Sequence, residues 1–119
     1  MDPKIKEVIR QYRAYKGRSV PAVDASDDEY IDIIIDRGEY IDQIDRDSHR
    51  WWDTFVQIKK FQTAEDKFYF IGYEFASANR DESIYDLGYE FDPDTISFYK
   101  EYEVIRKDYE QLTPDEVEV

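Results

Sequence analysis

Residues 52–76 read WDTFVQIKKFQTAEDKFYFIGYEFA, and this stretch decides the fold. In its first half the side chains alternate with the period of two that strands have, Trp52, Thr54, Val56 and Ile58 on one side and Asp53, Phe55 and Gln57 on the other. The polar segment 62–66 predicts a turn, and residues 67–76 form a second strand-like run. The sequence therefore predicts a β-hairpin that forms much of the core.

A basic helix is predicted over residues 1–18. Pro3 suits a first helical turn, Gly17 suits the end of the helix, and apolar residues recur at helical spacing at Ile5, Val8, Ile9 and Tyr12. Six Lys or Arg residues stand against two acidic ones in this segment. On so acidic a chain we expect them to dock on the protein's own carboxylates rather than on a membrane or a nucleic acid. Residues 19–25 are expected to form a linker.

Residues 26–47 fit two interpretations. The pattern Ser26-Asp27-Asp28-Glu29 is that of a capping box, which would begin a helix, whereas Ile31, Ile33 and Ile35 alternate as on a strand. We favour the strand and keep the helix as the alternative. In the strand interpretation Arg37-Gly38 turns a hairpin between residues 29–32 and 39–42.

The C-terminal third is predicted to be less regular. Residues 79–88 read as a loop with one helical turn at 83–86, residues 92–94 as a break, and residues 95–105 as a last strand. We expect residues 110–119 to form a frayed acidic tail. The predicted fold is α+β, an N-terminal helix packed against an antiparallel meander of four or five strands. Residues 1–119 would form a single domain with its α+β body at 26–109.

The charge of the chain is large and unevenly placed. The formal net charge is -13, and the acidic excess lies in residues 19–48 and 80–119. Such a charge repels nucleic acids and anionic membranes and attracts cationic proteins, so we expect neither direct nucleic-acid binding nor membrane binding. An aromatic content of 17% argues for a folded chain rather than an acidic disordered one.

Few residues offer catalytic chemistry. The chain has no Cys and only one His, His49, so thiolate metal sites, disulfides and a histidine-based nucleophile system are not expected. Neither a Ca²⁺-binding loop nor a phosphate-binding glycine loop is present. We therefore expect no cofactor, no dedicated metal site and no enzymatic activity. The chain shows no signal peptide and no membrane span, and we expect it in the cytoplasm.

Two rows of acidic residues remain as the candidate partner-binding residues. On a strand, Asp32 and Asp36 would share one face, and on a helix Asp28, Asp32, Asp36 and Glu39 would form one stripe. Asp42 extends this first row. The second row interleaves carboxylates with aromatic residues that could anchor a partner: Tyr85, Asp86, Tyr89, Glu90, Asp92 and Asp94.

In composition the chain resembles the small acidic inhibitors of phages and mobile elements, the anti-CRISPR and anti-restriction DNA mimics. The acidic rows at 24–47 and 81–103, the absence of Cys and the size carry this resemblance, and no family motif is present. It implies an inhibitor that occupies the nucleic-acid site of a CRISPR effector, a restriction enzyme or another basic nuclease complex in the host cytoplasm. The alternatives are an immunity protein that neutralises a basic nuclease toxin and a small carboxylate-dependent hydrolase.

Overall fold

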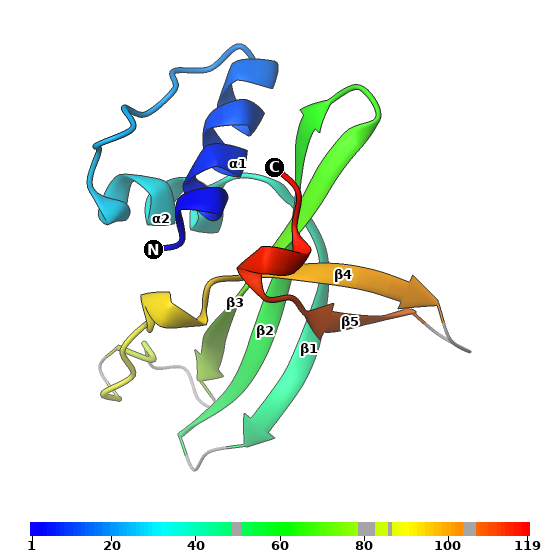
Figure 1. Ribbon diagram of the computed structural model, residues 1–119. Coiled ribbons are helices and arrows are strands. Elements are labelled where there is room, and N and C mark those ends of the chain that lie inside the picture. The colour runs from blue at the N-terminus through cyan, green and yellow to red at the C-terminus, as the bar shows by residue number, and fades with distance from the viewer. Residues whose placement is uncertain (49–50, 79–82, 86, 104–106) are drawn as a thin grey trace.

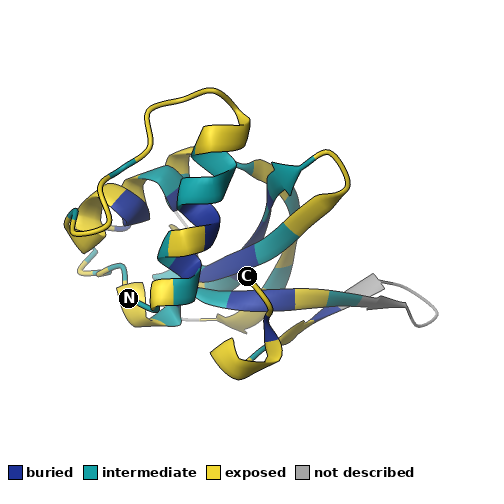
Figure 2. Ribbon diagram, turned by 45° about the horizontal axis from the view of Figure 1, so that its top comes forward, coloured by how far each residue is buried: buried dark blue, intermediate teal, exposed yellow. Residues whose placement is uncertain are grey.

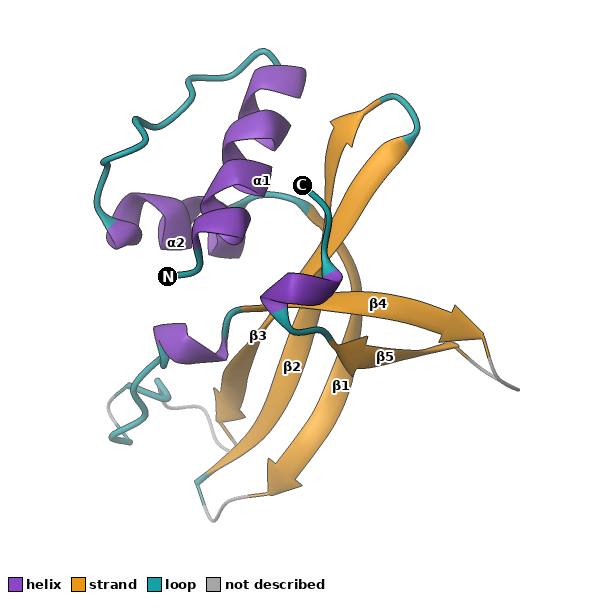
Figure 3. Ribbon diagram, in the orientation of Figure 1, coloured by secondary structure: helices purple, strands orange, loops and turns teal. Residues whose placement is uncertain are grey.

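The computed structural model of the protein describes residues 1–48, 51–78, 83–85, 87–103 and 107–119 (Figure 1). Two helices come first, α1 (Pro3–Tyr15) and α2 (Asp27–Asp36). They precede the strands β1 (Glu39–Ser48), β2 (Trp52–Ala64), β3 (Lys67–Ala78), β4 (Ser97–Glu103) and β5 (Lys107–Gln111). Short 3₁₀ helices, η1 (Pro93–Thr95) and η2 (Pro114–Glu116), flank the last two strands (Figure 3). The strands form one antiparallel sheet in sequence order, so the predicted α+β meander is confirmed.

The hairpin that the sequence predicted over 52–76 is β2 and β3. Its register pairs Phe55 with Phe75 and Lys59 with Ile71, and residues 65–66 form the turn. Because paired residues point to the same side of a sheet, the odd-numbered residues of both strands share one face. These two long strands organise the sheet, since β1 pairs with one of them and β4 with the other.

One face of the sheet, the helix face, is covered by α1 and α2. Phe61 of β2, Ile71 and Tyr73 of β3 and Phe98 of β4 are at most 2% exposed on this face. They pack against the buried stripes of the two helices, which are Ile5, Val8 and Ile9 on α1 and Tyr30, Ile31 and Ile34 on α2. In Figure 2 buried segments, drawn in dark blue, occur along the helices and along the strands next to them. Burial at helical spacing is therefore what fixes both helices to the sheet.

The opposite side of the sheet, the inner face, holds a second, smaller core. Its buried residues are Val56 and Ile58 of β2, Tyr99 of β4 and Tyr109 of β5, and Ile41, Ile44 and Phe70 pack against them. The rings of Phe70 and Tyr109 lie 5.8 Å apart edge to face. Since all five strands contribute to this cluster, the sheet is curled, with β4 and β5 running across the direction of β1 and β2 (Figure 1).

The strand favoured for residues 30–36 is wrong, and the helical alternative is the observed structure. Tyr30 and Ile34 are fully buried and Ile31 is 9% exposed, which is the spacing of one helix face and not of one strand face. Acidic residues in the first turn also suit the positive end of the helix dipole. Packing against α1 and the sheet outweighs the strand preference of the isoleucines.

The predicted hairpin turn at Arg37-Gly38 is accordingly a helix-to-strand connection. Gly38 has a φ of 80°, and a Cβ built on it would lie 2.8 Å from the ring of Phe61. Only glycine satisfies both the backbone conformation and the close approach. Residues 39–42, predicted as the second strand of that hairpin, do form a strand, but they belong to the longer β1, which pairs with β2.

The C-terminal predictions need two corrections. Residues 95–105 were predicted to hold the last strand, whereas β4 begins at Ser97 and β5 follows it. Residues 110–119 were predicted to be frayed, yet Val117 is only 7% exposed and its carbonyl accepts a hydrogen bond from Lys4 Nζ at 2.9 Å. Tyr69 also donates to the carbonyl of Glu118 at 2.7 Å. The tail is thus docked by contacts to residues more than 45 positions away, which no local pattern reveals.

Candidate partner-binding surface

Helix α2 presents a row of carboxylates to solvent, which we name the α2 stripe: Asp28, Asp32 and Asp36. These residues are exposed and follow one another at intervals of four, so successive side chains lie about 6 Å apart along the helix. Glu29 is exposed beside them. None of these four carboxylates forms a hydrogen bond or an ion pair with another described residue.

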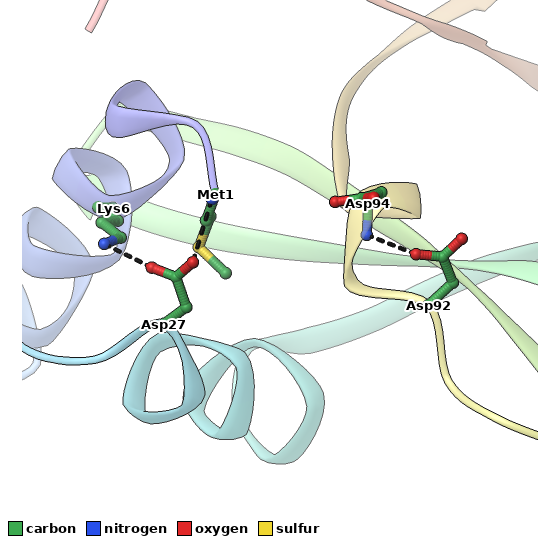
Figure 4. Close-up of polar contacts among 5 residues, drawn as sticks. All are labelled: Met1, Lys6, Asp27, Asp92 and Asp94. Carbon is green, nitrogen blue, oxygen red and sulfur yellow. Dashed lines mark hydrogen bonds and ion pairs between the residues drawn. The ribbon is translucent and has the colours of Figure 1, made fainter.

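Asp27 is the acidic residue of α2 that is engaged within the protein. Its carboxylate lies 2.6 Å from Lys6 Nζ and 3.2 Å from the amino group of Met1 (Figure 4). The hydrogen bonds from Lys6 and from the N-terminus hold the pKa of Asp27 below its ordinary value of 3.8. This pair is one place where α1 docks on the protein's own carboxylates, as expected from the sequence.

The last member of the α2 stripe borders a buried cation. Lys59 is 8% exposed, and its Nζ donates to the carbonyls of Ile35 and Arg37 at the end of α2. Burial lowers the pKa of Lys59, and the negative charge of Asp36 opposes that shift. Asp36 therefore has a structural role that Asp28 and Asp32 lack.

Glu39 and Asp42, the other two predicted members of the first row, belong to β1 and not to the stripe. The helical alternative placed Glu39 on the same stripe, but α2 ends at Asp36. Glu39 pairs with Lys60, and a register shift between Tyr40 and Asp42 places Asp42 opposite Ile58 on the inner face. The first row is thus divided between two surfaces of the protein.

The predicted second row is also divided. Tyr85 is 57% exposed, but Tyr89 packs edge to face on Trp52 at 5.7 Å and on Phe75 at 5.9 Å. Burial raises the pKa of the Tyr89 hydroxyl, which donates to the carbonyl of Glu74. Tyr89 therefore contributes its ring to the fold.

The carboxylates of the second row also differ from one another in their roles. Asp92 accepts a hydrogen bond from the main-chain N–H of Asp94 at 2.9 Å and so caps η1 (Figure 4). Glu90 and Asp94 are exposed. Asp86 lies outside the described residues, as does His49.

A hydrolase would need a carboxylate pair in a cavity, and the inner face brings two carboxylates to one tyrosine. Tyr109 donates to Glu101 Oε2 at 3.3 Å, and burial, together with Glu101 and Asp42, raises the pKa of Tyr109 to about 12. At neutral pH this phenol is therefore a hydrogen-bond donor. The hydrogen bond between Tyr109 and Glu101 links β5 to β4.

A cavity of about 560 Å³ lies elsewhere, between the start of α1, η1 and the C-terminal segment. Its lining includes the carboxylates Asp2 and Asp94 beside apolar Ile5, Ile96 and Phe98. Asp2 caps α1 by accepting from the main-chain N–H of Lys4 at 2.7 Å. Within the described ranges, no three His, Asp or Glu side chains gather as metal ligands would.

Sequence reasoning missed one residue of the exposed acidic surface. Glu29 belongs to the capping pattern at 26–29, and this pattern already implies a helix on which Glu29 and Asp28 are neighbours. Assigning the segment as a helix would have found it.

Comparison with protein-family models, with curated proteins and with solved structures gives no significant match to this chain. Of the helices in the described part of the chain, none is long and apolar enough to cross a membrane.

Proposed function

We propose that this protein is a non-enzymatic inhibitor that binds a basic nucleic-acid-binding protein through the exposed carboxylates of α2. The partner would be a CRISPR effector, a restriction enzyme or a similar nuclease complex, and α2 would occupy part of its nucleic-acid site. The observation that carries the proposal is the set of four exposed carboxylates on α2, Asp28, Glu29, Asp32 and Asp36, none of which forms an ion pair with another described residue. Only Asp36 lies near a cation of the protein, the buried Lys59.

The spacing of charge on α2 supports this proposal. The ten residues of the helix include five carboxylates and no Lys or Arg. Asp27 is paired with Lys6, and at a rise of about 1.5 Å per residue the other four carboxylates occur about every 4 Å of the helix axis. One strand of duplex DNA carries about one phosphate every 3.4 Å. A groove of Lys and Arg side chains that follows a DNA strand would therefore meet a similar charge density on α2 over about 15 Å.

The rigidity of α2 supports it as well. Tyr30 and Ile34 are fully buried under α1 and the sheet, so the carboxylates stand on an anchored helix. An anchored helix loses less conformational entropy on binding than a disordered acidic segment does. Exposed charges mainly accelerate and orient association, so binding should weaken as salt concentration rises.

The test is capture of a partner from a host lysate on the immobilised protein, followed by elution with duplex DNA. The variant D28N/E29Q/D32N removes three exposed carboxylates and leaves Asp36 beside Lys59. The matched control E65Q/D66N/E118Q removes three exposed carboxylates away from α2. We expect duplex DNA to release the captured protein, the α2 variant to capture at least tenfold less of it, and the control to capture it normally.

Two results would contradict the proposal. One is undiminished capture by the α2 variant, provided that its circular dichroism spectrum matches that of the wild type. The other is a captured nuclease that duplex DNA does not displace, which would favour an immunity protein that binds outside the nucleic-acid site.

A further inference from the structure

A second charged surface has the opposite sign. Tyr12, Arg13, Lys16, Arg18 and Arg37 line a cavity of about 350 Å³, which we name the basic pocket. None of the described residues that line it is acidic, although acidic residues outnumber basic ones by 13 in the whole chain. Like charges gathered around one cavity repel each other, so a bound anion lowers the electrostatic energy of the cluster.

Two helix ends build the basic pocket. Gly17, at a φ of 66°, turns the chain after α1 so that the N–H of Arg18 bonds back to the carbonyl of Arg13 at 2.9 Å. Arg37 follows the last residue of α2. The next residue, Gly38, donates its N–H to the hydroxyl oxygen of Tyr12 at 3.1 Å. Arg13 thus comes from α1, Lys16 and Arg18 from the residues that directly follow α1, and Arg37 from the end of α2.

Basic residues often stabilise helix C-termini by bonding to the last carbonyls, but here those carbonyls have other partners. At the end of α1 the carbonyls of Tyr12, Arg13 and Ala14 accept main-chain N–H groups. At the end of α2 the carbonyl of Ile33 accepts the N–H of Arg37, and that of Ile35 accepts Lys59 Nζ. The side chains of Lys16, Arg18 and Arg37 are therefore not needed as caps.

The donors of the basic pocket remain largely available. Arg13 uses its Nε to bond the carbonyl of Ser19 at 2.9 Å, which orients its guanidinium group. Within the described part of the chain, none of the four cations has an ion-pair partner. The Tyr12 hydroxyl accepts from Gly38, so its own hydrogen is free to donate.

We propose that the basic pocket binds the phosphate group of a small phosphorylated molecule. Three guanidinium groups offer paired N–H donors that match phosphate oxygens, and the ammonium and the phenol add two more donors. The four positive charges attract a phosphate dianion more strongly than they attract a carboxylate with its single negative charge. The exposed carboxylates of α2 repel a long polyanion. The ligand is therefore a small phosphate and not a nucleic acid.

The test follows the main-chain N–H of Gly38 by NMR while inorganic phosphate, a nucleoside monophosphate or a short DNA duplex is added at constant ionic strength. We expect saturable shifts with the first two ligands and none with chloride or the duplex. The variant R18Q/R37Q should bind phosphate at least tenfold more weakly. The control K67Q/K100Q removes the same charge from exposed lysines outside the pocket and should bind as the wild type does.

The proposal is overturned if phosphate causes no saturable shift, if the control loses affinity as much as R18Q/R37Q, or if the duplex binds more tightly than the monophosphate. Replacing Tyr12 by Phe adds a finer measurement, because it removes the hydroxyl donor and keeps the ring against Phe61. Phosphate affinity should fall about threefold to tenfold in Y12F, a loss of one hydrogen bond. The assay uses the isolated protein, so its outcome is independent of the α2 proposal.

Discussion

Helices α1 and α2 rest on one core, and they differ in what their charged side chains contact. On α1, Lys4 bonds the carbonyl of Val117, Lys6 pairs with Asp27, and Arg10 bonds the carbonyl of Pro21. On α2, four of five carboxylates have no such contact within the described residues. The charges over most of α1 therefore hold the protein together, whereas those of α2 are left for a partner. Substitutions test this difference. In decreasing order of expected effect on stability, they change buried residues, residues at helix ends and exposed charges.

The largest expected effect is on the residues that anchor the helices. Ile9 and Ile34 are both fully buried, so I9A and I34A should each lower the free energy of unfolding by about 2–5 kcal/mol. Urea denaturation followed by circular dichroism measures the change. A much smaller loss for I34A would show that α2 is loosely attached, and it would weaken the view of α2 as a rigid surface for binding.

The helix ends differ too, since main-chain groups cap α1 and a side chain of β2 caps α2. Removing the Lys59 donor in K59M leaves the carbonyls of Ile35 and Arg37 without that partner, and we expect a loss of about 1–3 kcal/mol. K60M, which changes the neighbouring residue on the inner face, should cost less. Equal losses in the two variants would show that the cap contributes nothing special.

The pH dependence of this effect has a definite sign. Burial lowers the pKa of Lys59 from 10.5 in the folded protein, so below pH 10.5 the unfolded chain binds more protons at this group. The contribution of Lys59 to stability therefore rises with pH across the interval between its lowered pKa and 10.5. The difference in unfolding free energy between wild type and K59M should grow over that interval. A constant difference would contradict the burial of the ammonium group.

The smallest expected effect is on the α2 stripe itself. Asp32 lies four residues from both Asp28 and Asp36, so D32N should relieve repulsion and raise stability by about 0.2–0.5 kcal/mol per pair. D28N is the comparison, because Asp28 lies in the first turn, where loss of a favourable dipole interaction offsets the relief. A clear loss of stability in D32N would mean that this carboxylate has a structural partner.

The candidate site was predictable only where local spacing determines it. The interval of four between Asp28, Asp32 and Asp36 is written in the sequence, and a helix was one of two interpretations considered. The separation of Asp42 from this stripe depends on a register shift in β1, and the partial burial of Tyr89 depends on Trp52 and Phe75. The basic pocket depends on Arg37 meeting residues within and directly after α1, which are 19 or more positions away. None of these contacts leaves a periodic signal.

The sequence by itself determined the net charge, the basic first helix and the β2–β3 hairpin, because composition, helical spacing and alternation with a local turn are local properties. Only the tertiary structure decided that residues 27–36 form a helix, that β5 completes the sheet and that the C-terminal segment docks on α1. In each of these cases burial against distant residues outweighed the local preference. The same long-range packing turned the acidic segment into one exposed stripe on an anchored helix.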